Sequence, residues 1–315
     1  MPSVDAKWAV AVFSSRESVS QLLNAMASCR TACGTSSAVI DVVINGNVGL
    51  ATALSTELGG GALGANAGAS IRVWNISLGD KSHAWNTYTH EIWPSGSVTY
   101  FVDGYVEVYE HSFERLSTAL ATHPHARAAT GIPTMGRSAD RQTRFQIEIS
   151  GIHGNLYALS REAVLKIRES GFRLPLGLYR TDPTLESCLK FDFDPSAHAW
   201  NKHRVVVVTD ATWRRRVSSP WRIADWVAHW RRMIRQAQGD VEQQALKTFF
   251  VIDKKRPSEL PETAEELLRQ WIGRFPSRWR RMALAKPLRL FAIRRACQPR
   301  DWAQVGIPPR LISTF

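Results

Sequence analysis

The hydrophobic positions of the chain follow two alternating spacings through its first two thirds. Short runs of apolar, mostly β-branched or aromatic residues predict strands, and the segments between them carry apolar residues at helical spacing. We expect strands at 7–13, 38–44, 71–76, 98–102, 128–132 and 204–209, and helices ending near 30 and at 48–58, 82–92, 110–121, 161–170 and 184–190. This alternation predicts an α/β layered fold, built on a mixed, mainly parallel sheet flanked by helices.

Polar residues follow several of these predicted strands. In parallel sheets, ligands bind at the carboxyl ends of the strands, which here lie at 14–17, 45–47, 77–81 and 103–105. Asp103 ends a buried strand and is poorly solvated there unless it is paired or bound to a metal. Lys81 follows a glycine turn, a place suited to meeting phosphate oxygens. An ordinary cap and a surface lysine are the alternative interpretation of these two residues.

One glycine-rich segment matches a nucleotide-binding fingerprint by its letters alone. Gly59, Gly61 and Gly64 have the spacing of the dinucleotide fingerprint, but a helix precedes them and a strand follows, which reverses the required order. We therefore expect a flexible connection there. The polar segment 136–144 is predicted to be a mobile loop, and 151–160 combines glycines with a short apolar run.

Cysteine usage and hydropathy favour a protein of the reducing cytosol. Four cysteines are too few for a disulfide scaffold, and their spacing makes no paired zinc motif. Cys29 and Cys33 lie four residues apart on a predicted helix, as packed small hydrophobes do. No apolar run approaches the roughly 20 residues that span a bilayer, and no secretory signal is visible at the start.

The net charge is distributed unevenly along the chain. The 315 residues carry +12, yet residues 1–199 hold 16 basic and 18 acidic side chains, whereas residues 200–315 hold 24 basic and 10 acidic. The first part is therefore near neutral at −2, and the last third is +14. Seven of the twelve tryptophans lie between residues 213 and 302. A basic, tryptophan-rich end favours an anionic surface as its partner.

Two helices are predicted at the start of this basic end. Apolar residues recur at helical spacing over 223–237 and 262–272, and we expect Trp226, Trp230 and Trp271 to pack these helices against the body. Ser219 and Pro220 suit the cap and first turn of the earlier helix.

The segment 274–300 has a different pattern. Its arginines are interleaved with Trp, Leu and Phe, which is typical of helices that lie in an anionic membrane interface. Binding of a nucleic acid is the rival interpretation, because basic and aromatic residues together also track phosphates and stack on bases. No zinc finger, KH loop or RNP strand occurs in the sequence, and this favours the membrane.

An ordered set of motifs resembles the family-two glycosyltransferases, which have the GT-A nucleotide-sugar fold. Taken in order, these motifs look like the opening strand and turn, the base-holding turn, the lysine-containing segment, the metal-binding DxD, the glycine-rich acceptor segment and the base motif. They lie at 10–17, 42–47, 75–86, 101–106, 151–159 and 180–182. The resemblance covers roughly residues 7 to 195, at spacings typical of the family.

The resemblance implies a role for each matching residue. The nucleotide-sugar donor would be bound by Ser14, Arg16, Glu17, Asn45, Lys81, Asp103, Gly104 and Tyr105, and the acceptor would face His153, Gly154 and Asn155. Asp182 holds the place of the family's base, so it would accept the proton of the acceptor hydroxyl in a single displacement that inverts the anomeric centre.

Two departures from the family pattern change the expected site. Tyr105 stands where the second aspartate of DxD is expected, so the Mn²⁺ or Mg²⁺ site at Asp103 is incomplete. We expect weaker metal dependence, with Lys81 or the arginines of the predicted loop (Arg137, Arg141 and Arg144) sharing the diphosphate charge. Asn45 replaces the aspartate that would read the base, although an amide still hydrogen-bonds a pyrimidine edge. His198 or His203 is a candidate for a C-terminal metal ligand, with a loop histidine as the alternative.

These features together predict an inverting glycosyltransferase with a GT-A catalytic domain at 1–212 and a helical basic region at 213–315. It would move a sugar from a nucleotide donor, UDP-linked in our interpretation, to a glycan or lipid-linked acceptor. We expect it in the cytoplasm, peripherally associated with the inner face of the membrane through 274–300. A catalytically degenerate scaffold and, less favoured, a nucleic-acid-binding protein are the alternatives.

Overall fold

The computed structural model describes residues 8–64, 68–135, 139–215 and 223–315. The chain forms two compact units, and each is described here by itself. The first contains the described parts of residues 1–171, 201–216 and 302–315, and the second those of 172–200 and 217–301. The chain thus leaves the first unit twice and returns to it twice, a division that differs from a single boundary at residue 212.

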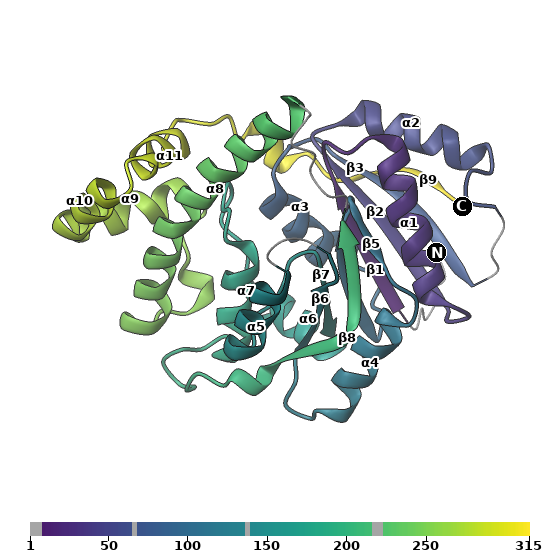
Figure 1. The fold of residues 1–315 in the computed structure, drawn as a ribbon, viewed down its shortest axis with the longest axis horizontal. Coiled ribbons are helices and arrows are strands. Elements are labelled where there is room, and N and C mark those ends of the chain that lie inside the picture. The colour runs from purple at the N-terminus through teal and green to yellow at the C-terminus, as the bar shows by residue number, and fades with distance from the viewer. Residues whose placement is uncertain (1–7, 65–67, 136–138, 216–222) are drawn as a thin grey trace. The chain divides into compact units, whose positions relative to one another are not determined.

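In the described part of the chain, the first unit is built on one nine-stranded sheet (Figure 1). The strand order is β5-β8-β6-β7-β4-β1-β2-β3-β9. The strands are β1 (Trp8–Ser14), β2 (Ala38–Asn45), β3 (Ala69–Ile76), β4 (Val98–Asp103), β5 (Val106–Val108), β6 (Ala128–Pro133), β7 (Leu156–Ser160), β8 (Val205–Arg215) and β9 (Arg310–Thr314).

The strand directions confirm the predicted fold class. Strands β3, β2, β1 and β4 pair in parallel, and so do β6 and β8. Strands β5, β7 and β9 pair antiparallel with their neighbours. The sheet is therefore mixed and mainly parallel, and the carboxyl ends of β1, β2, β3 and β4 share one edge.

Helices cover both faces of this sheet. The helices of the first unit are α1 (Val19–Cys33), α2 (Val48–Gly59), α3 (Lys81–Thr87), α4 (Ser112–Thr122), α5 (Ala139–Ile149) and α6 (Arg161–Glu169), with a π-helical turn η1 (Tyr88–Ile92) and short 3₁₀ turns η2 (Lys202–Arg204) and η5 (Ala303–Gly306). Capping side chains set several starts: Ser18 forms a capping box with Gln21, and Asp80 accepts a hydrogen bond from the N–H of His83. Such caps satisfy N–H groups that have no partner within the helix.

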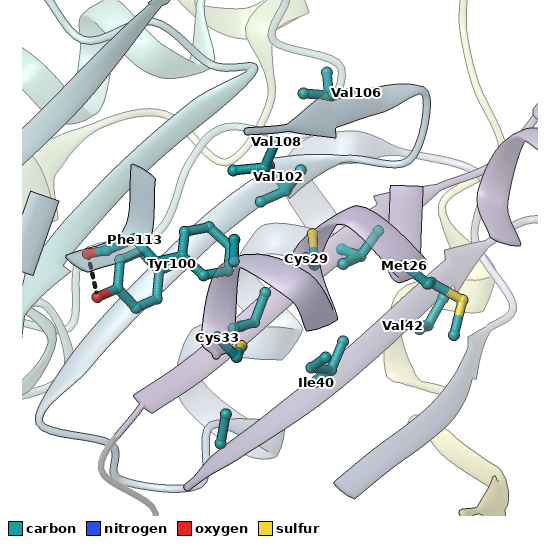
Figure 2. Close-up of a cluster of buried hydrophobic side chains, with 14 of the residues drawn as sticks. Met26, Cys29, Cys33, Ile40, Val42, Tyr100, Val102, Val106, Val108 and Phe113 are labelled. Carbon is teal, nitrogen blue, oxygen red and sulfur yellow. Dashed lines mark hydrogen bonds between the residues drawn. The ribbon is translucent and has the colours of Figure 1, made fainter. Parts of the chain in front are cut away.

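Helices α1, α2 and α4 pack on one face of the sheet over the main core. Met26, Cys29 and Cys33 of α1 are buried against β2 and β4 (Figure 2), as the helical spacing of the two cysteines predicts. Burial raises the pKa of both thiols, that of Cys33 to about 12, so they are neutral packing groups. The hydroxyl of Tyr100 donates to the carbonyl of Phe113, which joins β4 to α4.

The opposite face carries an aromatic cluster centred on Phe101 of β4. Its ring stacks on Tyr157 of β7 at 4.7 Å and lies beside Phe13, Trp85 and Tyr88. The indole N–H of Trp85 donates to the hydroxyl of Tyr157, at 2.8 Å. The contacts of Trp85 and Tyr88 thus hold helix α3 and the η1 turn against β4, the strand that ends in Asp103.

A buried ion pair lies inside the parallel part of the sheet. Asp41 of β2 is fully buried and accepts two hydrogen bonds from Arg72 of β3, at 2.7 and 2.9 Å, and one from the indole of Trp74, at 2.8 Å. Burial raises the pKa of Asp41, and the bonds from Arg72 oppose this shift. The pair fixes the register of β2 and β3, whose ends form the site.

The second unit is helical in its described part. It consists of α7 (Thr181–Lys190), α8 (Ile223–Lys247), α9 (Ala264–Arg274), α10 (Pro276–Ala285) and α11 (Leu288–Ala296), with a π-helical turn η3 (Thr248–Ile252) and a 3₁₀ turn η4 (Pro257–Glu259). Arg289 of α11 donates to Asp240 of α8 at 2.7 Å, and Ala292 packs beside Ile234. The indole of Trp271 donates to Thr248 at 3.0 Å, so α9 is held to the end of α8.

Three predicted details of the structure are wrong. The mobile loop predicted at 136–144 belongs from residue 139 onward to the helix α5. Residues 136–138 lie outside the described residues, and so does the predicted cap at Ser219 and Pro220. Trp226 and Trp230 are 64% and 52% exposed, so they do not pack the helix, whereas Trp271 is buried as expected. Strands β5, β7 and β9 are additional to the predicted ones.

No helix in the described part of the chain is both long enough and apolar enough to cross a bilayer.

Candidate functional site

The loops that follow β2 and β3 touch each other through glycine. Gly46 has a φ of +66°, and a Cβ placed on it would lie 2.4 Å from the Cα of Gly79. Its N–H donates to the carbonyl of Ile76 at 2.8 Å. Since only glycine permits this approach, the two loops form one continuous wall at the carboxyl edge of the sheet.

The loop after β1 is organised around the carboxylate of Glu17. One oxygen of Glu17 accepts the hydroxyl of Ser14 at 2.7 Å and the N–H groups of Ser15 and Arg16 at 2.8 and 3.0 Å. Glu17 therefore shapes the turn, and the Arg16 side chain is left exposed. A carboxylate with three donors is well stabilised, and its charge is directed into the turn.

Two asparagines join the end of β2 to this turn. Asn45 is buried and its side-chain NH₂ donates to the carbonyl of Ser14 at 3.1 Å. Asn47 donates in the same manner to Ser15 at 2.9 Å and caps α2 through the N–H of Leu50. The predicted base-reading residue Asn45 thus holds the ends of β1 and β2 together.

Asp103, at the end of β4, is the centre of the polar cluster. Its Oδ1 lies 2.7 Å from the ammonium of Lys81, and its Oδ2 accepts the hydroxyl of Tyr105 at 2.8 Å. The same hydroxyl lies 3.1 Å from Oδ1 of Asn155, and the carbonyl of Asn155 accepts the N–H of Asp103. The structure therefore brings together four residues that the sequence assigned to two different sides of the site.

Gly104 allows this cluster to sit against β1. A Cβ at Gly104 would lie 2.9 Å from the Cβ of Ser14 and 3.0 Å from the carbonyl oxygen of Phe13, to which the Gly104 N–H donates at 2.7 Å. A side chain at this position would push β4 away from β1. The prediction that Gly104 lies at the nucleotide edge is consistent with this close approach.

Tyr105 is held as a neutral hydrogen-bond donor. Desolvation of the hydroxyl and the adjacent Asp103 carboxylate raise the pKa of Tyr105 well above its ordinary value. The charge of Arg215, at the end of β8, acts in the opposite direction. Arg215 therefore lies close to this cluster, a position that the sequence did not reveal because Arg215 falls within a basic run of the chain's last third.

The donor set at Asp103 does not fit a divalent metal. Both carboxylate oxygens are engaged, one by a cation and one by a hydroxyl that donates its proton. Among the described residues, no three His, Cys, Asp or Glu side chains gather into a group that would hold a metal ion. Mn²⁺ and Mg²⁺ prefer several oxygen ligands, including at least one available carboxylate.

The predicted acceptor side lies between β6 and β7. The N–H of His153 donates to the hydroxyl of Thr130 at 3.0 Å, its Nδ1 accepts the N–H of Asn155 at 3.2 Å, and its Nε2 lies 2.6 Å from Gln142 of α5. The imidazole also lies 4.8 Å from the ring of Trp213. His153 and Asn155 are therefore fixed in one loop, with Gly154 between them.

Helix α5 contributes to this side in a manner that the sequence missed. Its Gln146 is buried and donates to Thr130 and to the carbonyl of Gly131, both at 3.2 Å. Arg141 and Arg144 are exposed on the same helix, and Arg137 lies outside the described residues. The expected arginine loop is thus in part a helix, which the amides of Gln142 and Gln146 join to the acceptor side.

Asp182 belongs to the second unit, where it lies half-buried in the first turn of α7. The hydroxyl of Thr181 donates to Oδ1 of Asp182 at 3.2 Å. The preceding turn is held by the buried Glu242 of α8, which accepts the N–H groups of Tyr179 and Arg180 at 3.1 and 2.9 Å. Burial raises the pKa of Glu242. Glu242 thus holds the backbone that leads into α7, a contact that no local pattern in the sequence indicates.

The histidine candidates for a metal ligand belong to different units of the chain. His198 belongs to the second unit, with its Nε2 3.9 Å from Oδ2 of Asp192. His203 is exposed in the η2 turn of the first unit. Neither belongs to a metal-binding group of the kind described above.

Comparisons with known proteins support the fold. No family model and no curated protein matches the sequence. The mannosyltransferase PcManGT from Pyrobaculum calidifontis, solved with GDP-Man and Mn²⁺, has a TM-score of 0.53 and 14% identity over 96% of this chain and 86% of its own. S. aureus TarS 1–349 with UDP-GlcNAc gives 0.49, with 14% identity over 92% and 90% of the two chains. Glucosyl-3-phosphoglycerate synthase from Mycobacterium tuberculosis, in complex with phosphoglyceric acid, gives 0.49 and 14% over 77% and 79%. The likeness to PcManGT confirms that this chain has the predicted GT-A fold.

Proposed function

We propose that this protein is a glycosyltransferase that moves a sugar from a nucleotide donor to an acceptor hydroxyl. The observation that carries the proposal is the cluster of Lys81, Asp103, Tyr105 and Asn155 at the carboxyl edge of a GT-A sheet. In open α/β sheets this edge is where ligands bind. Six segments that resemble the family's motifs follow one another along the chain in the expected order.

The donor would be bound by the loops after β1, β2 and β3. The turn of Ser14 and Glu17, tied to Asn45, suits the nucleoside, for which we propose a uracil base. Arg16 is exposed beside this turn and is available to a phosphate or a ribose. Lys81 would meet the diphosphate and stabilise the charge that develops on it as it leaves.

Transfer would be a single displacement with inversion, and we assign the base role to Asp182. Its carboxylate would accept the proton of the acceptor hydroxyl as that oxygen attacks the anomeric carbon and the bond to the diphosphate breaks. The hydroxyl of Thr181 steadies Oδ1 of Asp182. The acceptor would face the loop of His153, Gly154 and Asn155, which Thr130 and Gln142 hold in place.

The basic surface of the second unit would place the enzyme on an anionic membrane. Leu284 is 81% exposed, Leu290 and Phe291 are also exposed, and the same two helices, α10 and α11, carry five exposed arginines (Arg278, Arg280, Arg281, Arg294 and Arg295). Trp226 and Trp230 of α8 add exposed aromatic area beside Arg231 and Arg232. Each basic residue near an anionic leaflet contributes about 1 kcal/mol. We propose a cytoplasmic protein that binds the inner face and takes a glycan or lipid-linked acceptor there.

A donor screen followed by a transfer assay tests the function. UDP- and GDP-linked sugars are added to the full chain, and the rise in melting temperature identifies the donor. Asp182→Asn is expected to bind the donor normally and to lose transfer. Unchanged turnover of Asp182→Asn would contradict the base assignment. Donor binding without hydrolysis or transfer by the wild type would favour the degenerate scaffold.

Flotation with liposomes tests the membrane surface separately. The wild type is expected to float with vesicles that contain an anionic phospholipid and not with neutral phosphatidylcholine vesicles. Replacing both Arg280 and Arg281 by glutamate is expected to abolish flotation. Lys202→Glu, a single charge reversal in the first unit, is expected to preserve it. Equal flotation of all variants would contradict this surface, and a shift of random nucleic acid in a gel would favour the rival partner.

A further inference from the structure

The polar cluster at the end of β4 contains its own cation. The ammonium of Lys81 lies 2.7 Å from Asp103, yet the Lys81 side chain is 44% exposed while that of Asp103 is only 12% exposed. The carboxylate is thus covered, and the positive charge is the part of the pair that faces outward. A ligand that approaches this edge meets Lys81 before it meets Asp103.

Tyr105 closes the other side of the same carboxylate. Its hydroxyl lies between Oδ2 of Asp103 and Oδ1 of Asn155, at 2.8 and 3.1 Å, and both neighbours are acceptors. The hydroxyl proton is therefore directed at an acceptor in this arrangement, and the Tyr105 oxygen is a poor ligand for a cation. A metal that bound Oδ2 would first have to displace this hydrogen bond.

Charge neutrality also favours a cluster without a metal. The charge of a divalent cation and two carboxylates sums to zero. The charge of Lys81, Asp103 and a neutral Tyr105 also sums to zero. A divalent cation added to the present cluster would leave an excess of two positive charges, within direct contact distance of an ammonium. The charges of Arg215 and Glu17 both act on Tyr105 and have opposite signs, so they do not remove this excess.

We propose that Lys81, with Tyr105 as its partner on Asp103, takes the place of a divalent cation and binds the donor's diphosphate without a metal. This inference rests on the proposed glycosyltransferase function. Lys81 contacts the diphosphate directly, and Asp103 holds the ammonium at the edge of the sheet. Tyr105 fixes Asp103 and keeps its second oxygen from a metal.

Binding of nucleoside diphosphates by calorimetry tests the first half of this inference. UDP and GDP are titrated into the full chain in the presence of Mn²⁺ or of EDTA. The wild type is expected to bind one of them equally well in both buffers. Lys81→Ala is expected to weaken binding about 10- to 100-fold, the loss typical of one charge-assisted hydrogen bond. Lys202→Ala, an exposed lysine of the same unit, is the matched control and should bind as the wild type does.

Binding of the metal alone tests the second half. Tyr105→Asp supplies the missing carboxylate, and Mn²⁺ titrated into this variant is expected to give a bound signal by electron paramagnetic resonance. Diphosphate binding by Tyr105→Asp should then become sensitive to EDTA. Tyr105→Phe removes the hydroxyl without adding a ligand, so it controls for a general loosening of the loop and should not bind Mn²⁺.

The outcomes separate this inference from the function on which it rests. If EDTA abolishes diphosphate binding by the wild type, or if the wild type binds Mn²⁺ as tightly as Tyr105→Asp does, the metal-free cluster is refuted while the glycosyltransferase function stands. If the wild type binds neither UDP nor GDP in either buffer, the proposed function is refuted, and the assignment of Lys81 to a diphosphate falls with it.

Discussion

The contact between Gly46 and Gly79 provides a sharp test of how the site is built. We predict that Gly46→Ala destabilises the first unit and weakens donor binding together. The added Cβ would lie 2.4 Å from the Cα and 2.9 Å from the nitrogen of Gly79. Both are backbone atoms, so no side-chain rotation relieves the clash and the loops after β2 and β3 must separate.

The expected cost has two parts. A non-glycine residue in the left-handed region costs about 1–2 kcal/mol, and forcing atoms into a packed contact costs about 1–3 kcal/mol more. Gly171→Ala is the matched control, because Gly171 has almost the same φ, +65° against +66°, but a Cβ there would have no neighbour within 4 Å. Gly171→Ala should therefore show the first part alone, about 1–2 kcal/mol.

Urea unfolding followed by tryptophan fluorescence measures both variants against the wild type. The free energy of unfolding is expected to fall further for Gly46→Ala than for Gly171→Ala, by the packing part of about 1–3 kcal/mol. Nucleotide binding should weaken in Gly46→Ala alone, since Asn45 and Lys81 flank the two loops. An equal loss of stability in the two variants, or an unchanged affinity in Gly46→Ala, would refute this account of the site.

Three further substitutions test other parts of the structure. Asp41→Asn leaves the partly buried charge of Arg72 without its carboxylate, so we expect the free energy of unfolding, measured in urea, to fall by up to about 3 kcal/mol. A fall below about 1 kcal/mol would show that the pair contributes no more than an ion pair on the surface. Glu242→Gln brings an amide NH₂ close to the backbone N–H groups of Tyr179 and Arg180, so we expect the free energy of unfolding to fall by about 1–3 kcal/mol. A melting curve like that of the wild type would contradict this prediction. Asp194 has a pKa lowered to about 2, mainly by the Ser196 hydroxyl, so its stabilisation is present above the usual 3.8 and is lost as the pH falls toward 2. Asp194→Asn should flatten that acid limb of the melting temperature, and an unchanged limb would contradict it.

The central strands could be predicted because their local pattern and their burial agree. Strands β1, β2 and β4 are buried at every position, and their apolar runs are short and bounded by turns. Strands β5 and β9 are different, because each is short and forms an outer edge of the sheet. Strand β9 pairs with β3 across more than two hundred residues of sequence. Such a pairing leaves no local signal.

Spacing also could not decide which helix faces are covered. Trp230 and Trp271 both recur at helical spacing, yet Trp230 is exposed and Trp271 is buried and hydrogen-bonded to Thr248. Helix α5 shows the opposite problem, since Gln146 is its single buried side chain and no apolar stripe marks it. Helical spacing of apolar residues predicts that they share one face of a helix, but only the tertiary neighbours determine whether that face is buried.

The strand pattern predicted which residues lie at the carboxyl edge of the sheet, but it did not predict their hydrogen-bond partners. Parallel strands bring Ser14, Asn45 and Asp103 to the same end of the sheet, so their grouping followed from the strand pattern. The choice of partners depends on side-chain reach. No local pattern indicates that Tyr105 bridges Asp103 to Asn155, fifty residues later in the chain.

The pairing of the acidic groups explains how a near-neutral part of the chain could bind an anionic donor. Glu17 is stabilised by three donors from its own turn, and Asp103 is covered by Lys81 and Tyr105. In the pair at the end of β4 the ammonium of Lys81 is therefore the more exposed charge, although residues 1–199 sum to −2. A net charge counts every carboxylate equally, whereas an approaching diphosphate responds to those that local donors have not already satisfied. For this reason the charges close to the end of β4, and not the net charge of the last third, should govern the affinity for the donor.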